Sequence, residues 1–341
     1  MRILIDILHP AHVHFFKHFR TEMKERGHEV LVTAREKDIA LDLLQELDIP
    51  HEVISTQRTG LLGMAGELAQ RSWRLARIAR RFRPDVLTGI MGVSIAPVGR
   101  LLRIPSVVFY DTEFAARTNR FIYPMATAVC TPDCYEGSVR GRHVTYPGYH
   151  ELAYLHPSRF TPDRSALGDF GLAQDEPFSI LRFVSWEASH DVGEKALSAQ
   201  QKTGLVATLE RFGSVLISSE APLPPDLRDR QLTGPTSRIH DLVGFAKLLV
   251  GESATMASEA AVLGTPSVFI ATSGRGYISD QEHRYGLTRW FQPEAFGDAL
   301  AAVNELGEVP AERWAEARAA LLNDKIDLTP WQVDFFTTEF G

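Results

Sequence analysis

The chain has few cysteines and no long apolar run. Of its 341 residues only Cys130 and Cys134 are cysteines, and no second pair exists to complete a zinc site or a disulfide framework. No apolar stretch approaches the ~20 residues needed to span a bilayer, and Asp6 interrupts the N-terminal apolar run, which is atypical of a signal peptide. We therefore predict a reduced, cytoplasmic protein that makes at most peripheral contact with a membrane.

The sequence also lacks an excess of basic residues and the common nucleotide-binding motifs. The 36 Lys and Arg against 43 Asp and Glu give a net charge of −7, which argues against general nucleic-acid binding. Neither GxGxxG nor GxxxxGK[ST] occurs, which counts against Rossmann dehydrogenases and P-loop enzymes.

Alternating strand and helix patterns are what the sequence does contain. They run through residues 1–150, lapse in a proline-rich linker over 151–177, and resume over 178–325. The helix predicted in 326–341 places Trp331, Phe335 and Phe336 on one face, so we expect it to pack back on the N-terminal domain. The prediction is an α/β protein with two doubly wound, Rossmann-like domains and a cleft between them. The expected strands are 3–8, 29–34, 51–55, 85–91, 106–111, 128–133, 178–186, 214–219, 247–253 and 266–271.

Four histidines follow the first predicted strand: His9, His12, His14 and His18. The carboxyl end of a strand in an open α/β sheet is where ligands bind. An imidazole with a pKa near ~6.5 can accept a hydroxyl proton, so His12 is the candidate base, with His9 as its substitute or orienting partner. No carboxylate or cysteine lies close enough in sequence to complete a metal site, and packing or capping accounts for His14 and His18.

Acidic clusters follow two further strands. Asp111 and Glu113 come after 106–110, and His190 with Asp191 follows the strand at 178–186. Both clusters are placed for proton transfer at a ligand-binding edge, although helix capping explains the first equally well.

The stretch GESATMASEAAVLGTPSVF, residues 251–269, runs from a strand through a small-residue turn into a helix. Free amides and the dipole at a helix N-terminus suit phosphate, with Ser253 or Thr255 as the cap. One turn on, Glu259 could accept both ribose hydroxyls. An ordinary capped turn is the alternative reading.

The same stretch resembles the C-terminal signature of GT-B glycosyltransferases, including the N-acetylglucosaminyltransferase of peptidoglycan synthesis, and of the UDP-N-acetylglucosamine 2-epimerases. That resemblance implies that Ser253, Ala254 and Thr255 contact the diphosphate and that Glu259 contacts the ribose. It also implies donor-sugar contacts for the DQE stretch, which is Asp280, Gln281 and Glu282.

Over nearly the whole chain, the blocks IDILHPAHVHFFKHF, RGHEVLVTAR, RFVSWEASHDVG and GESATMASEAAVLGTPS resemble domain-of-unknown-function family 354, described as predicted glycosyltransferases. Relatives often carry two glycines where this chain has Gly251 and Glu252, so either Glu252 points away from a diphosphate or the ligand differs. The resemblance implies an inverting, metal-independent transferase with no resident cofactor, a nucleotide-sugar donor (most simply a UDP-sugar) as substrate, and a glycan or lipid-linked acceptor.

Two alternatives stay open at this point. One is a 2-epimerase that uses Asp111, Glu113 and His190 for proton transfer, and the other is a non-catalytic nucleotide-sugar binding protein. The arginine-rich helix expected over 63–83 is either a face for anionic membrane or a solvated outer helix.

Overall fold

The computed structural model describes the chain except residues 38, 114–115 and 185–195. The described residues form two compact units. Unit 1 consists of Met1–Tyr154 together with Ile326–Gly341, and unit 2 consists of Leu155–Lys325. Neither unit contains a helix that combines the length and the apolar character needed to cross a bilayer, among the residues described.

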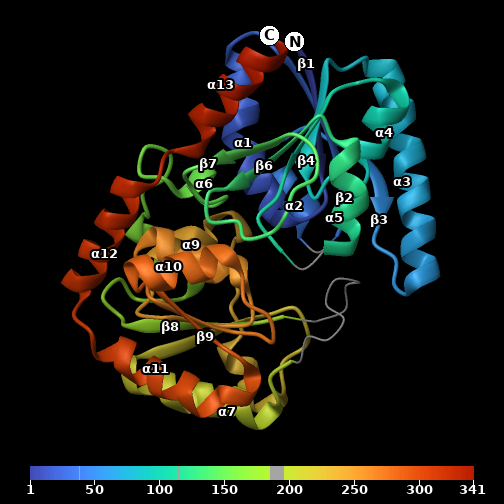
Figure 1. Cartoon of the computed structure of the whole chain (residues 1–341). Helices are drawn as coiled ribbons and strands as arrows, with labels where there is room; N and C mark the ends of the chain where they lie inside the picture. The colour runs from blue at the N-terminus through green and yellow to red at the C-terminus, as the bar shows by residue number, and fades with distance from the viewer. Residues whose placement is uncertain (38, 114–115, 185–195) are drawn as a thin grey trace. The chain divides into compact units, whose positions relative to one another are not determined.

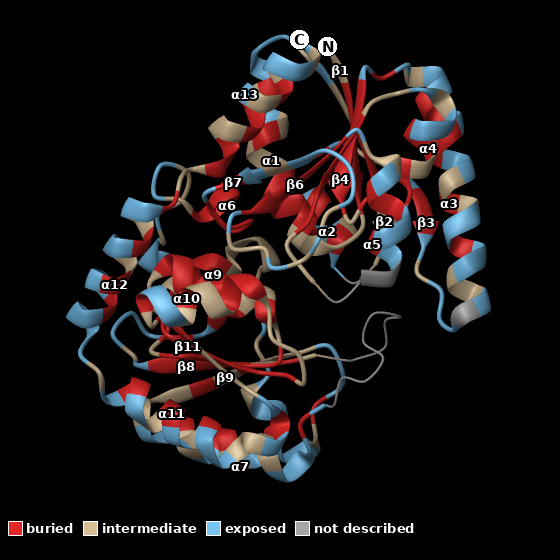
Figure 2. Ribbon diagram, in the orientation of Figure 1, coloured by how far each residue is buried: buried red, intermediate tan, exposed pale blue. Residues whose placement is uncertain are grey.

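Unit 1 is built on a seven-stranded parallel sheet with the order β3-β2-β1-β4-β5-β6-β7. Its central strand β1 is a run of branched apolar residues, and Ile3, Leu4 and Ile5 are wholly buried, as expected for a strand covered on both faces. In Figure 2 the strands β1, β4, β5 and β6 are red along most of their length, whereas the outer strands β3 and β7 are red only in part. The strands are β1 (Arg2–Ile7), β2 (Glu29–Glu36), β3 (Glu52–Thr56), β4 (Val86–Ile90), β5 (Ser106–Phe109), β6 (Ala128–Pro132) and β7 (His143–Tyr146).

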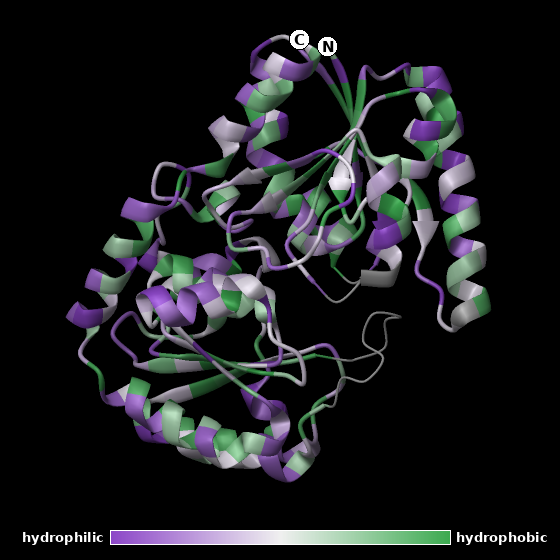
Figure 3. Cartoon of the chain, viewed as in Figure 1, coloured by the Kyte–Doolittle hydropathy of each residue, from purple (hydrophilic) through white to green (hydrophobic). Residues whose placement is uncertain are grey.

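Helices connect these strands, with α1 packed against α2 and α13, and α3 against α4 (Figure 1). Their hydropathy is two-sided, with apolar and polar positions alternating along each ribbon in Figure 3. The helices are α1 (Pro10–Glu25), α2 (Ala40–Glu46), α3 (Leu61–Phe82), α4 (Ile95–Leu102), α5 (Ala116–Ile122), α6 (Leu152–Leu155, ending one residue into unit 2) and α13 (Leu328–Phe340).

Helix α13 completes the core of unit 1. Phe336 is wholly buried, its ring 4.8 Å from that of Phe19 and stacked at 6.5 Å on Phe109. Trp331 lies 5.1 Å from Tyr146, measured between ring centroids. The aromatic face expected from the sequence therefore packs against α1, β5 and β7.

Unit 2 holds a five-stranded parallel sheet with the order β12-β11-β10-β8-β9. Helices α7 and α11 lie together on one side of it, and α9 and α10 on the other (Figure 1). The strands are β8 (Phe178–Phe183), β9 (Ser214–Ser219), β10 (Leu249–Gly251), β11 (Ser267–Ile270) and β12 (Thr288–Phe291). The helices are α7 (Ala199–Leu209), α8 (Ile239–Phe245), α9 (Ala254–Leu263), α10 (Gly276–Tyr285), α11 (Phe296–Glu308) and α12 (Ala311–Asp324).

Several details differ from the sequence expectation. The strands β7 and β12 were not expected, and the segment 151–177 contains α6 and a 3-10 helix over Arg164–Phe170. Helix α3 is not merely a solvated outer helix, because the Arg71 side chain is 2% exposed and donates to the Asp6 carboxylate, with its Nη2 2.5 Å from Asp6 Oδ1. That side chain belongs to the interior of unit 1.

Candidate functional site

Each sheet has one point where the strand order reverses direction. In unit 1 it lies between β1 and β4, and in unit 2 between β8 and β10. Ligands of open parallel sheets bind outside the carboxyl ends of the strands at such a point. The histidine run, His9 to His18, follows β1, and the GESAT turn, residues 251–255, begins at the end of β10. Both sequence motifs therefore lie at these edges.

The β10–α9 turn of unit 2 is shaped by glycine and capped by serine. Gly251 has a φ of 149°, and a Cβ there would lie 2.0 Å from the carbonyl oxygen of Arg182. Ser253 is the N-cap of α9, and its Oγ accepts from the amide of Met256. The amides of Ala254 and Thr255 have no carbonyl acceptor inside the helix, and a helix end of this kind, with its dipole, is suited to an anion.

Glu259 lies one turn further along α9 and is paired with a residue that the sequence did not suggest. Its Oε1 is 2.9 Å from Nε2 of His240 on α8, and both side chains are nearly wholly buried. The two residues are 19 positions apart, and no local pattern links them. The carboxylate expected to hold a ribose is therefore fixed in orientation by an imidazole.

The Glu252 carboxylate, one residue before the N-cap of α9, is held by the backbone. It is buried and accepts from the amides of Val184, at 3.1 Å, and Leu197, at 2.8 Å. An acidic residue in this turn thus joins two backbone segments.

The DQE stretch lies in the second turn of α10, and its side chains bond inside unit 2. Asp280 Oδ2 is 3.2 Å from Nζ of Lys325, and Gln281, with no exposed surface, donates to Oγ of Ser258. Glu282 accepts from the backbone amide at 290. These contacts fasten α10 to α12, α9 and β12, and the predicted donor-sugar role of the three residues stays a prediction.

At the edge of unit 1, His9 and His12 both act as acceptors. His9 is the N-cap of α1, with its Nδ1 accepting from the amide of Ala11, and Nδ1 of His12 accepts from the amide of Leu8 at 3.3 Å. The cluster of histidines after the strand is thus used partly to satisfy exposed amides at a strand–helix turn. Burial is the main reason that the pKa of His12 lies well below its usual value, and positive charge on His9 adds to this.

Asp111 follows β5 and is paired with His150, a second residue that the sequence analysis missed. Asp111 Oδ2 lies 3.0 Å from Nδ1 of His150, and the hydroxyl of Thr112 donates to Oδ1. Glu113, which was predicted together with Asp111, accepts from the backbone amide of Glu136 at 3.4 Å, and its proton-transfer role stays a prediction. His150 follows β7, an unpredicted strand, so nothing in the sequence placed it near Asp111.

The remaining histidine predictions divide. His14 is buried, with its ring stacked 5.3 Å from that of Tyr154. His190 and its neighbours from Trp186 to Asp191 lie outside the described residues. Within the described ranges, no three His, Cys, Asp or Glu side chains gather as metal ligands would.

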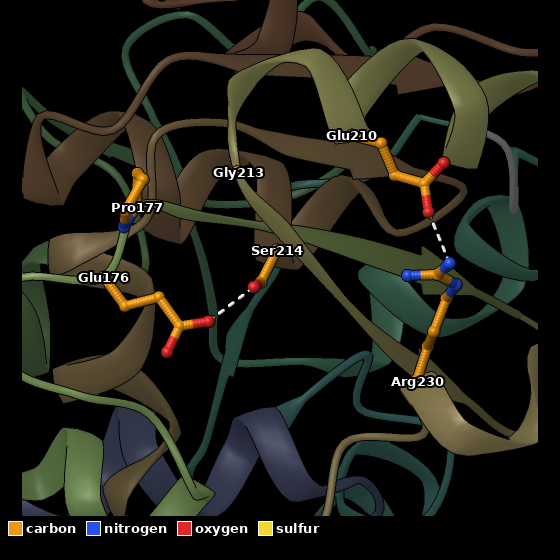
Figure 4. A pocket seen from close by; sticks show the side chains of 6 residues that line it. All are labelled: Glu176, Pro177, Glu210, Gly213, Ser214 and Arg230. Atoms are coloured by element: carbon orange, nitrogen blue, oxygen red, sulfur yellow. Dashed lines mark hydrogen bonds and ion pairs between the residues drawn. The ribbon is translucent and has the colours of Figure 1, made fainter.

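A shallow depression of about 490 Å³ lies in unit 2, at the opposite edge of its sheet (Figure 4). It opens at the amino ends of β8 and β9, whereas ligands of such sheets bind at the carboxyl ends. Its polar groups are paired with one another, Glu176 with Ser214 and Glu210 with Arg230. The depression therefore lies away from the edge at which such sheets bind ligands. Its lining residues are Glu176, Pro177, Glu210, Gly213, Ser214 and Arg230.

Comparison with known proteins gives a family and a fold. The family described as "Protein of unknown function (DUF354)" matches residues 1–197. The uncharacterized protein MJ0665 of Methanocaldococcus jannaschii is 21% identical over 78% of this chain and 80% of its own. The pyrophosphoryl-undecaprenol N-acetylglucosamine transferase of Syntrophotalea carbinolica is 35% identical, over 28% of this chain and 29% of its own.

Among solved structures, MurG of Acinetobacter baumannii superposes with a TM-score of 0.57 at 16% identity, over 99% of this chain and 100% of its own. The UDP-GlcNAc 2-epimerase of Methanocaldococcus jannaschii gives a TM-score of 0.63 at 11% identity, over 99% of both chains. The chain has the GT-B fold, as the sequence resemblance implied.

Proposed function

This chain belongs to the DUF354 family, and we propose that it is a nucleotide-sugar-dependent glycosyltransferase. The proposal places the donor in unit 2, at the N-terminus of α9. Its acceptor is a glycan or a lipid-linked sugar, and UDP is the first nucleotide to test. Neither Cys130 nor Cys134 is in a disulfide, which fits a cytoplasmic location, where cysteines stay reduced.

The observation that carries the proposal is the β10–α9 turn. The N-terminus of α9, whose first amides have no carbonyl acceptor within the helix, lies at the topological switch point, and the acidic side chain in the turn, Glu252, accepts from the backbone amides of Val184 and Leu197. In the reaction the helix end stabilises the departing diphosphate, the role that a divalent cation plays in other transferases. The proposed transfer needs no metal for this role, and it is inverting, as the resemblance to GT-B glycosyltransferases implies.

Glu259 gives the site its preference for a nucleoside. Its carboxylate lies one turn inside α9, held by His240, and an ionised carboxylate accepts hydrogen bonds from ribose hydroxyls. Replacing it by glutamine keeps the shape and removes the charge.

The test is a thermal-shift panel with UDP, GDP, dTDP, CMP and their sugars, with and without EDTA. A nucleotide at a hundred times its dissociation constant adds ~2.7 kcal/mol of stability. At ~2–4 °C per kcal/mol this is a shift of several degrees. We expect one base to give this shift, unchanged by EDTA and reduced in Glu259→Gln.

Thr255→Glu is the sharper variant, with Thr255→Gln as its matched control. A glutamate in the first turn of α9 complements the helix dipole and supports folding, but it repels a diphosphate. We expect Thr255→Glu to keep its melting temperature and lose the nucleotide shift, whereas Thr255→Gln keeps both. Equal nucleotide-induced thermal shifts in the two variants would show that the N-terminus of α9 does not bind the diphosphate.

The second candidate is a sugar-nucleotide 2-epimerase, favoured by the likeness in fold to that enzyme and by the acid–histidine pair in unit 1. Epimerisation takes deuterium from heavy water into C2 of the sugar, and transfer does not. Anomeric NMR of a transfer product would show inversion directly, and tight nucleotide binding without either reaction would indicate a binding protein.

A further inference from the structure

Two histidines at the carboxyl edge of the unit 1 sheet hydrogen-bond in opposite senses. His12, after β1, accepts at its Nδ1 from the Leu8 amide, whereas His150, after β7, presents its Nδ1 to the Asp111 carboxylate. A neutral imidazole carries one proton, so the partner of Nδ1 decides what Nε2 can do.

For His12 the partner is a donor. A backbone amide can only donate, so Nδ1 must be unprotonated and the proton of the neutral ring resides on Nε2. Burial keeps the pKa of this ring well below its ordinary value, which favours the neutral form. His12 therefore offers a hydrogen-bond donor at Nε2 and no lone pair with which to take a proton.

For His150 the partner is an acceptor. An ionised carboxylate only accepts, so Nδ1 carries the proton and Nε2 holds a lone pair. This is the arrangement by which a carboxylate sets the tautomer of a histidine base. Two aromatic rings pack against the imidazole: the ring of Phe15, with the centroids 4.4 Å apart, and the ring of Tyr146, stacked with the centroids 6.4 Å apart.

Two polar atoms next to this pair lack partners. Nε2 of His150 and the hydroxyl of Tyr146 are both buried, and neither has a hydrogen-bond partner among the described residues. The His150 side chain is 8% exposed. Buried polar atoms of this kind are rare in folded proteins and are typical of groups that meet a substrate or an ordered water.

We propose that His150, oriented by Asp111, is the base that takes the proton of the acceptor hydroxyl, and that His12 is a hydrogen-bond donor in the same site. The inference rests on the proposed function. As the acceptor oxygen bonds to the anomeric carbon, its proton passes to Nε2 of His150. The bond from that carbon to the diphosphate breaks, and its electron pair leaves with the nucleotide. Asp111 stays ionised beside the imidazolium.

The first test does not depend on activity. The full chain labelled with ¹⁵N-histidine gives the tautomer of each ring from its nitrogen shifts, with His150→Gln and His12→Gln assigning the signals. We expect a protonated Nδ1 and a bare Nε2 in His150, and the reverse in His12. A proton on Nε2 of His150, or a bare Nε2 on His12, would overturn the proposal.

The second test is turnover. A general base contributes about 10²–10⁴-fold to rate, so His150→Gln should lose that much in kcat, while the nucleotide thermal shift stays as in wild type. Asp111→Asn should lose a comparable factor, because an amide no longer fixes the tautomer. His143→Gln is the matched control, since that ring lies on β7 and bonds to Thr131.

Chemical rescue separates a base from a packing residue. His150→Ala leaves room between two aromatic rings, and added imidazole should restore part of the lost turnover there but not in Asp111→Asn. Full turnover by His150→Gln would refute the assignment. A wild-type chain that binds no nucleotide would instead refute the proposed function, and the tautomers measured by NMR would then still show which of the two rings has a bare Nε2.

Discussion

The buried Asp6–Arg71 pair makes a strong prediction about stability. Both side chains are 2% exposed, and the guanidinium also donates to Oγ of Ser55, at 2.9 Å, and to the carbonyl of Ile7, at 3.1 Å. Asp6 also accepts from the hydroxyl of Thr33. Replacing Arg71 by methionine keeps most of the chain length and leaves a carboxylate buried without its counter-charge.

Removing one partner of a buried ion pair costs about 3–5 kcal/mol. At ~2–4 °C per kcal/mol, the melting temperature of unit 1 should fall by about 6–20 °C. The matched control is Arg81→Met on the same helix. Its pair with Glu52 is 66% and 37% exposed, where an ion pair contributes only ~0–1 kcal/mol.

The assay is differential scanning calorimetry of the full chain, in which the two units are followed as separate transitions if they do not unfold together. Arg71→Met should lower the transition of unit 1, and Asp6→Asn combined with Arg71→Met should recover part of the loss because no charge remains buried. Equal melting temperatures for Arg71→Met and Arg81→Met would refute the reasoning.

Three further predictions follow from single features. Gly251→Ala should destabilise unit 2 and abolish nucleotide binding, because its Cβ would lie 2.0 Å from the Arg182 carbonyl, and limited proteolysis together with the thermal-shift panel would show this. Phe336→Ala should cost about 3–5 kcal/mol in urea unfolding, against little for the exposed Trp73→Ala, since only the first leaves a cavity in a core. Because the pKa of His12 is lowered in the folded chain, the unfolded chain binds more protons below about pH 6.5. The free energy of unfolding therefore decreases as the pH is lowered through that range. In His12→Asn the slope of the unfolding free energy against pH should be smaller by up to ~1.4 kcal/mol per pH unit, the contribution of one proton, in urea titrations from pH 7 to 5. An unchanged slope would contradict this prediction.

The sequence predicted the strands whose formation depends on a local pattern of residues. Strand β9 begins and ends at the expected residues, 214 and 219, because it is a short run of apolar and β-branched residues after a glycine. Strands β7 and β12 are four residues long and lie at sheet edges, where His143 and Arg289 interrupt any apolar pattern. These two strands form because they pair with a neighbouring strand, and a short window of sequence does not contain that neighbour.

The candidate site was predictable only in part, for the same reason. Ser253 as the cap of α9 follows from its type and position, because capping is a local interaction. The pairings of Glu259 with His240 and of Asp111 with His150 join residues 19 and 39 positions apart, the first between two helices and the second between segments that follow two different strands. Arg71 looked like a surface arginine because the sequence does not show which face of α3 meets Asp6.

The return of α13 to unit 1 has a consequence for how the chain is made. On the ribosome, all of unit 2 emerges after residue 154 and before Phe336, which fills the core between Phe19 and Phe109. The sheet of unit 1 is therefore synthesised first, and the aromatic surface of Phe19 and Phe109 stays uncovered until unit 2 and then α13 have been synthesised. Slow translation through residues 155–325 lengthens that exposure, so the nascent first unit is the stage at which this protein most needs a chaperone.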